Sequence, residues 1–181
     1  MSIPSDLPPS PLAGRIDVRP APAFLLAHPA HLLALGFGCG LSPIAPGTVA
    51  TLWAWASFAL LQVVLPPTAL ALLVLGAVPL AWWSGTVTAR SLGRADPSPV
   101  VIDEIASFWL VLWVFTPAPV IDQFGAFCLF RLFDALKPGP VGWADRHFHG
   151  PGWRGGFGIL FDDLVAAGCT LLVLAFWRFF A

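Results

Sequence analysis

The chain has 181 residues, of which 57% are hydrophobic and 10% are charged, with a mean hydropathy of +0.81 and a net charge of −1. An ordinary soluble domain is about 25% charged, so this composition is typical of an integral membrane protein. The near-neutral charge argues against a nucleic-acid-binding protein, and the length suits one domain with four or five membrane-embedded helices.

The N-terminal segment differs from the rest of the chain. Residues 1–23 contain six prolines and no periodic apolar face, so we expect a disordered tail. This segment also lacks the apolar core of a secretory signal peptide. A single helical membrane domain is predicted over residues 24–181. It opens with a short apolar stretch, 24–35, and a Gly-rich and Pro-rich turn that ends at Thr48.

Five apolar runs predict the main helices of an all-α, membrane-embedded bundle. They cover residues 49–65, 68–89, 100–115, 120–136 and 159–180. The first two are the clearest spans, whereas the third and fourth are short and predict a partly inserted hairpin. Basic residues precede the first run and follow the second and fourth. Alternating crossings therefore place every polar cluster on one face, which the positive-inside rule makes cytoplasmic.

The three cysteines, Cys39, Cys128 and Cys169, are odd in number and widely spaced. Two of them lie inside apolar runs, where a thiol packs as a small hydrophobic group. We therefore predict free thiols, with neither a disulfide framework nor a zinc site.

Two adjacent pairs of acids are the most informative feature of the chain. No charged residue occurs between Arg19 and Arg90, yet Asp103-Glu104 and Asp162-Asp163 lie against apolar runs, near predicted helix starts. Burying a carboxylate there is unfavourable unless a partner compensates for it, and a divalent metal or a phosphate-bearing substrate is suitable. A first-turn acid that complements the helix dipole is the structural alternative for either pair.

Three other charged positions share one helix face. Arg131 and Asp134 are three residues apart, and Lys137 follows one turn later. An intrahelical ion pair explains Arg131 and Asp134 as well as a phosphate site does. Two cations and an acid on one stripe suit a phosphate group held beside a metal.

Two further polar segments have both functional and structural interpretations. The Gly-rich segment 141–158 is predicted to be a loop, and its polar side chains include Asp145, Arg146, His147 and His149. Such a loop carries function or is simply hydrated at the headgroup level, and the histidine spacing is a weak metal signal. Ser42 and Thr48 offer hydroxyl groups to a phosphate, or Ser42 is an N-cap followed by Pro43 as a first-turn proline.

Four motifs occur in order along the chain: GFGCGLSPIAPGT (36–48), VIDE (101–104), FRLFDALKP (130–138), and HG followed by GFGILFDD (149–163). Together, from about residue 31 to residue 168, they closely resemble the bacterial phosphatidylglycerophosphatase A family. The resemblance implies an all-helical, Mg²⁺-dependent phosphatase of the bacterial inner membrane. Its reaction converts phosphatidylglycerophosphate to phosphatidylglycerol and phosphate in phospholipid biosynthesis. Residues 151–155 are an apparent insertion relative to the family.

The resemblance also suggests roles for the matched residues at the cytoplasmic membrane surface. The predicted metal ligands and catalytic carboxylates are Asp103, Glu104, Asp134, Asp162 and Asp163. The predicted substrate-binding residues are Ser42, Thr48, Arg131, Lys137 and Arg146. His149, with an ordinary pKa near 6.5, is expected to protonate the leaving glycerol oxygen. An attacking water and an aspartyl-phosphate intermediate both remain open.

Two other functions are compatible with acids in an apolar chain. A membrane lipid headgroup phosphotransferase has a similar metal-bound acid cluster but needs a second substrate pocket. A small transporter is expected to carry its acids in mid-span, whereas these acids lie near predicted helix ends. The oligomeric state and the number of metal ions are left open by the sequence.

Overall fold

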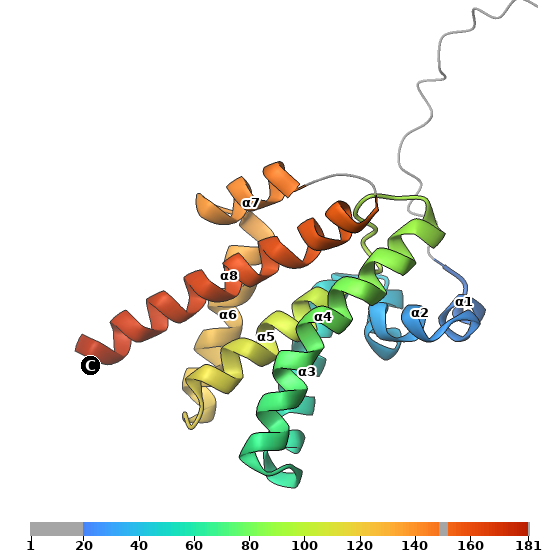
Figure 1. The fold of residues 1–181 in the computed structure, drawn as a ribbon. Helices are drawn as coiled ribbons and strands as arrows, with labels where there is room; N and C mark the ends of the chain where they lie inside the picture. Colours follow the sequence, from blue (N-terminus) through green and yellow to red (C-terminus); the bar gives the residue numbers. More distant parts are fainter. Residues whose placement is uncertain (1–19, 149–151, 181) are drawn as a thin grey trace, which may run out of the picture.

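The computed structural model describes residues 20–148 and 152–180, which form helices and turns without a strand (Figure 1). The elements are α1 (Pro22–Ala27), α2 (Pro29–Ala34), the 3₁₀ segment η1 (Gly36–Leu41), α3 (Pro46–Val64), α4 (Pro67–Leu92), α5 (Ile102–Phe115), α6 (Val120–Leu136), α7 (Pro140–Phe148) and α8 (Trp153–Phe180). The predicted all-α fold is confirmed, and α3, α4, α5, α6 and α8 correspond to the five predicted apolar runs.

Three of these helices, α3, α4 and α8, are long and apolar enough to cross a membrane. Helices α5 and α6 are shorter, with 14 and 17 residues, and the residues between Phe115 and Val120 join them into a hairpin. The free thiols predicted for all three cysteines are also confirmed.

Helix α5 is the centre of the bundle, where it contacts α3, α4, α6 and α8 (Figure 1). Its side chains are apolar around most of the helix, and Ile105, Phe108 and Leu112 are at most 1% exposed. A helix that is apolar on all sides is stable only when other helices surround it. Because α5 begins with Asp103 and Glu104, its central position carries both carboxylates into the protein interior.

The structure differs from the sequence prediction between residues 140 and 158. In place of a polar loop, α7 forms, and α8 begins at Trp153, well before the predicted start at residue 159. The glycines of this region serve close packing. A Cβ at Gly156 would overlap Thr86 of α4, and a Cβ at Gly158 would overlap the Phe148 carbonyl of α7. Helix α8 therefore packs directly on α4 and α7.

This earlier start of α8 changes the position of the second acid pair. Asp162 and Asp163 lie in the third turn of α8, so the prediction that they stand at a helix start is wrong. The helix dipole acts within the first turn and does not account for them. The apparent insertion is helical from Trp153 onward, because Trp153, Arg154 and Gly155 form the first turn of α8, and Gly152 before them is a turn residue.

At the other end of the chain, α1 begins at Pro22, just inside the segment predicted to be a tail. Residues 1–19 of that segment lie outside the described residues.

Candidate active site

The position of the first acid pair is fixed by the segments before α5. The backbone N–H of Val101 donates to the Ala34 carbonyl at the end of α2, at 2.8 Å. Gly40 of η1 lies so close to the Pro99 carbonyl that a side chain there would overlap it. These contacts hold the connector against α2 and η1. The first turn of α5, with Asp103 and Glu104, is thereby placed against α3 and α8.

Three carboxylates converge at the centre of the bundle. One oxygen from each of Asp103, Glu104 and Asp163 lies within 4.8 Å of the other two. Asp103 is 7% exposed and Asp163 is 4% exposed. Three buried oxygens, Asp103 Oδ1, Glu104 Oε2 and Asp163 Oδ2, have no hydrogen-bond partner within residues 20–148 and 152–180. Such oxygens are costly unless a cation or a donor binds them.

The pKa values of the two α5 carboxyls show the same cost of burial. Burial, together with the charge of Glu104, raises the pKa of Asp103 well above its ordinary range. Burial and the charge of Asp134 raise the pKa of Glu104 to about 7, against the lowering influence of Asp103 and Arg131. Both carboxyls thus resist ionisation without a compensating positive charge.

Two cations border the carboxylate cluster. Arg131 of α6 forms an ion pair with Asp134 on the same helix, and its Nη1 lies 3.9 Å from Glu104 Oε1. Lys137 Nζ contacts Asp145 Oδ1 of α7 and Asp162 Oδ2 of α8, each at 2.5 Å. Lys137 therefore joins α7 to α8. The sequence spacing predicts that Lys137 lies on the same helix face as Arg131, and that prediction is wrong.

The backbone explains this change of direction. Lys137 caps the C-terminus of α6 with φ 46° and ψ 50°, which is the left-handed conformation. The residue has left the helix, so the helical spacing from Arg131 no longer sets its direction. Burial lowers the pKa of Lys137, but the hydrogen bonds and charges of Asp145 and Asp162 outweigh it and raise that pKa above its ordinary value.

Gly47, in the first turn of α3, lies directly against the cluster. A Cβ on this residue would overlap Glu104 Oε1 and lie 3.1 Å from Arg131 Nη1. The absence of a side chain at residue 47 therefore lets α3 approach the acid pair of α5 and the arginine of α6 together.

The structure does not place every predicted residue in this cluster. The Ser42 hydroxyl donates to the Ile44 carbonyl at 2.8 Å, and Thr48 is half-buried beside Gly47. Arg146 is exposed on α7 and forms no ion pair within the described part of the chain. His147 is also exposed and contacts the Trp143 carbonyl. His149, the predicted proton donor, lies outside the described residues.

Sequence reasoning missed one residue at the cluster and one on the same helix face as Asp103. One is Gly47, whose signal is its position in the GFGCGLSPIAPGT motif. The other is Ser107, which is 0% exposed and whose Oγ has no partner among the described residues. Ser107 follows Asp103 by four residues, and that spacing places both on one face of α5.

The donor set fits a divalent metal. The converging atoms are all hard carboxylate oxygens, the ligands that Mg²⁺ prefers. Each of the three carboxylates also has one buried oxygen without a hydrogen-bond partner in the described segments. Asp103, Glu104 and Asp163 are the residues placed to hold such an ion. Asp134 and Asp162 are engaged instead by Arg131 and Lys137, which provide positive charge beside the cluster.

The fold and the site together define a helical membrane protein with a buried acidic centre next to cationic side chains. The family model described as Phosphatidylglycerophosphatase A matches residues 32–178. The chain is 36% identical over 151 residues to Phosphatidylglycerophosphatase A of Escherichia coli (strain K12), covering 83% of this chain and 84% of that protein. The chain therefore belongs to the phosphatidylglycerophosphatase A family, and it is an enzyme that acts on phosphate monoesters.

Two further relatives have similar coverage. Phosphatidylglycerophosphatase A of Haemophilus influenzae is 33% identical over 162 residues, which are 86% of this chain and 93% of that protein. A Bacteroides thetaiotaomicron protein named Putative phosphatidylinositol-3-phosphatase is 34% identical over 155 residues, which are 81% of this chain and 92% of that protein. No solved structure gives a significant match.

Proposed function

We propose that the protein hydrolyses the terminal phosphate of phosphatidylglycerophosphate, with Mg²⁺ held by the carboxylate cluster, at the cytoplasmic face of the bacterial inner membrane. The observation that carries this proposal is the convergence of Asp103, Glu104 and Asp163 with buried, unpartnered oxygens in the described structure. The family relationship supports the lipid substrate, because two relatives are named for this activity.

The proposed mechanism assigns distinct roles to the residues. Asp103, Glu104 and Asp163 would hold the ion, which would polarise the phosphoryl group and make an attacking water more acidic. Arg131, whose Nη1 lies 3.9 Å from Glu104 Oε1, would donate to phosphate oxygens when the substrate enters. Lys137 orients Asp162 and fixes α7 against α8, so that the walls of the site stay in register.

The distribution of charge supports the orientation. Arg90 lies in the last turn of α4 beside Trp153 of α8, and Arg154 lies in the first turn of α8. Lys137 caps α6 and contacts Asp162 of α8, and Arg146 lies on α7, so these cations gather where α4, α6 and α7 meet the first half of α8. Arg178, near the other end of α8, contacts the Phe115 and Pro117 carbonyls of the α5–α6 turn. The excess of cations at the first end agrees with a cytoplasmic site.

A second substrate deserves testing because one relative is named for a phosphoinositide. Phosphatidylinositol-3-phosphate shares the terminal phosphate monoester but presents a bulkier headgroup. The two substrates are therefore compared side by side in the same assay, and the higher kcat/KM identifies the preferred headgroup.

The test measures phosphate release from phosphatidylglycerophosphate in mixed micelles, with Mg²⁺ or with EDTA. The wild type is compared with Glu104→Gln and Asp163→Asn, and Asp122→Asn is the matched control, because Asp122 lies in the first turn of α6, outside the cluster. We expect Mg²⁺-dependent release by the wild type and the control, and loss in both cluster variants. Full activity in correctly inserted cluster variants would refute the assignment.

A further inference from the structure

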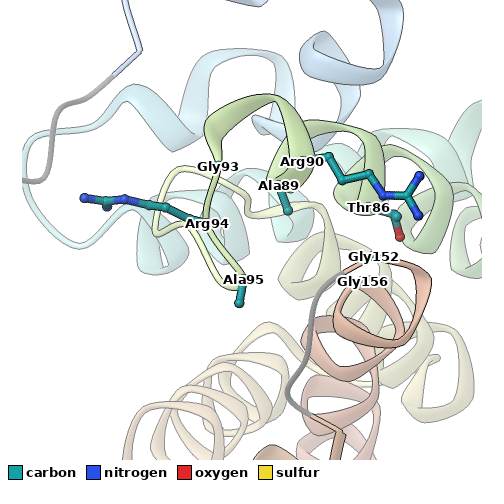
Figure 2. A pocket seen from close by; sticks show the side chains of 8 residues that line it. All are labelled: Thr86, Ala89, Arg90, Gly93, Arg94, Ala95, Gly152 and Gly156. Carbon is teal, nitrogen blue, oxygen red and sulfur yellow. The ribbon is translucent and has the colours of Figure 1, made fainter.

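A cavity lies outside the carboxylate cluster, where the end of α4 meets the start of α8 (Figure 2). Its volume is about 320 Å³, and it is lined by Thr86, Ala89, Arg90, Gly93, Arg94, Ala95, Gly152 and Gly156. Contact between Gly156 and Thr86 closes α4 against α8 at this point. The cavity is therefore part of a packed helix junction and has a fixed floor.

The charged residues of the lining are both cationic. Arg90 and Arg94 are the only ionisable residues among the eight lining positions. Figure 2 shows the Arg90 guanidinium on the side of Thr86 and Gly152, whereas the Arg94 side chain extends in the opposite direction. Asp96 follows in the connector but does not line the cavity. The electrostatic character of the cavity is thus set by Arg90 and favours an anion.

The Arg90 guanidinium is held in place but keeps its hydrogen-bonding edge available. Its Cζ lies 5.3 Å from the centre of the Trp153 ring, and Gly152 leaves room for its Nη2, which a Cβ there would approach to 3.2 Å. Within the described residues, Arg90 forms no ion pair. A guanidinium stacked on an aromatic ring still presents its in-plane N–H groups, whose geometry matches phosphate oxygens.

The start of α8 forms the other side of the cavity and adds to its preference for an anion. Trp153 is itself fixed, because the Trp82 indole N–H donates to its carbonyl at 3.0 Å and the two rings meet edge to face. Gly152 and Gly156 bring backbone close to Arg90 at the start of the 28-residue helix α8. Positive charge and small residues combine there in one cavity, outside the acidic centre.

We infer that the α4–α8 cavity is an anion site, with Arg90 as its principal ligand, that binds a phosphate group. That group belongs either to the headgroup of an anionic phospholipid or to inorganic phosphate. On α8, Gly156 lies two helical turns before Asp163, so the cavity is about 10 Å along the helix from the acidic cluster. The inference does not depend on the proposed substrate, because binding is measured without turnover.

The experiment follows inorganic phosphate by ³¹P NMR line broadening with the full-length protein in maltoside micelles. EDTA keeps divalent metal away from the acidic cluster, so any phosphate retained there is common to all variants. Arg90→Gln is compared with Arg154→Gln, which removes the same charge from an exposed position on the first turn of α8 that does not line the cavity. Ala95→Glu is a second variant, which places a carboxylate at the cavity and leaves Arg90 intact.

We expect phosphate binding by the wild type and Arg154→Gln, and about tenfold weaker binding in Arg90→Gln and Ala95→Glu, because each loses or opposes one charge-assisted interaction. Adding phosphatidylglycerol to the micelles distinguishes the sources. Displacement of phosphate identifies a lipid headgroup, and unchanged binding identifies free phosphate. The inference is overturned if the wild type binds no inorganic phosphate, or if both cavity variants bind it like the wild type. It is also overturned if Arg154→Gln loses as much affinity for phosphate as Arg90→Gln.

Discussion

Substitution of Gly47 by alanine tests whether the position of Glu104 matters for catalysis. The new Cβ would overlap Glu104 Oε1 and crowd Arg131 Nη1, at 3.1 Å. The Glu104 carboxylate must then move by about 1 Å, and a displacement of that size in a catalytic group reduces the rate on the order of 100-fold. This corresponds to about 2.7 kcal/mol of lost transition-state stabilisation.

The assay is phosphate release from phosphatidylglycerophosphate with Mg²⁺ varied, so that kcat and the apparent metal affinity are both obtained. Gly76→Ala is the matched control, because a Cβ at Gly76 of α4 meets no atom within 4 Å. Alanine there is expected to leave the rate unchanged and to favour the helix by roughly 0.5–1 kcal/mol. Wild-type kcat in a folded Gly47→Ala protein would show that the close approach of α3 to Glu104 has no part in the reaction.

Three other predictions concern the charged residues. Asp163→Asn is expected to abolish most activity yet raise the melting temperature of the metal-free protein in detergent, because it removes one of three converging buried charges; a lower melting temperature would contradict this. Mg²⁺ at about 100 times its Kd should stabilise the wild type by roughly 2.7 kcal/mol in a thermal-shift assay, and should not stabilise an Asp103→Asn/Asp163→Asn double variant. Lys137→Met should destabilise the protein by about 2 kcal/mol in SDS unfolding, because Asp162 is left buried without its partner. The loss is smaller than for a fully buried ion pair, because the half-exposed lysine is partly screened by solvent. Arg146→Met, which breaks no ion pair of the described structure, is the control.

The helices that the sequence predicts best are those with local stop signals. Helix α6 has the predicted bounds of residues 120 and 136, because Pro119 precedes it and Lys137-Pro138-Gly139 follows it. Helix α5 also begins near its predicted start, after two prolines in the connector. In both cases, the residues that start or stop the helix lie within one turn of it, so the sequence alone predicts the helix boundary.

The start of α8 has no such local signal. Gly155, Gly156 and Gly158 have low helix propensity and favour a loop when read alone. In the folded protein, the missing side chains of Gly156 and Gly158 allow contact with Thr86 and the Phe148 carbonyl, which lie in other helices. Packing against distant segments therefore outweighs propensity here, and a single sequence does not reveal which contacts are available.

The sequence predicts which residues form the candidate site, but not which of them pair with one another. Buried carboxylates in an apolar chain indicate a compensating cation, and that argument applies to Asp103 and Asp163 without any structure. The partner of Lys137 is different, because its left-handed backbone turns the side chain from α6 toward Asp145 and Asp162. The predicted stripe of two cations and an acid assumes that the helix continues through residue 137, and it does not.

The two acidic pairs are therefore not equivalent walls of one metal site. Neighbouring residues on a helix point about 100° apart, so an adjacent pair buried at an interface addresses two different partners. On α8, Asp163 joins the carboxylate cluster, whereas Asp162 holds the lysine that ties down α7. On α5, Asp103 and Glu104 both reach the cluster because the pair lies in the first turn, with Gly47 making room for Glu104. One carboxylate of the four thus positions the site, and the other three form the centre proposed to bind metal.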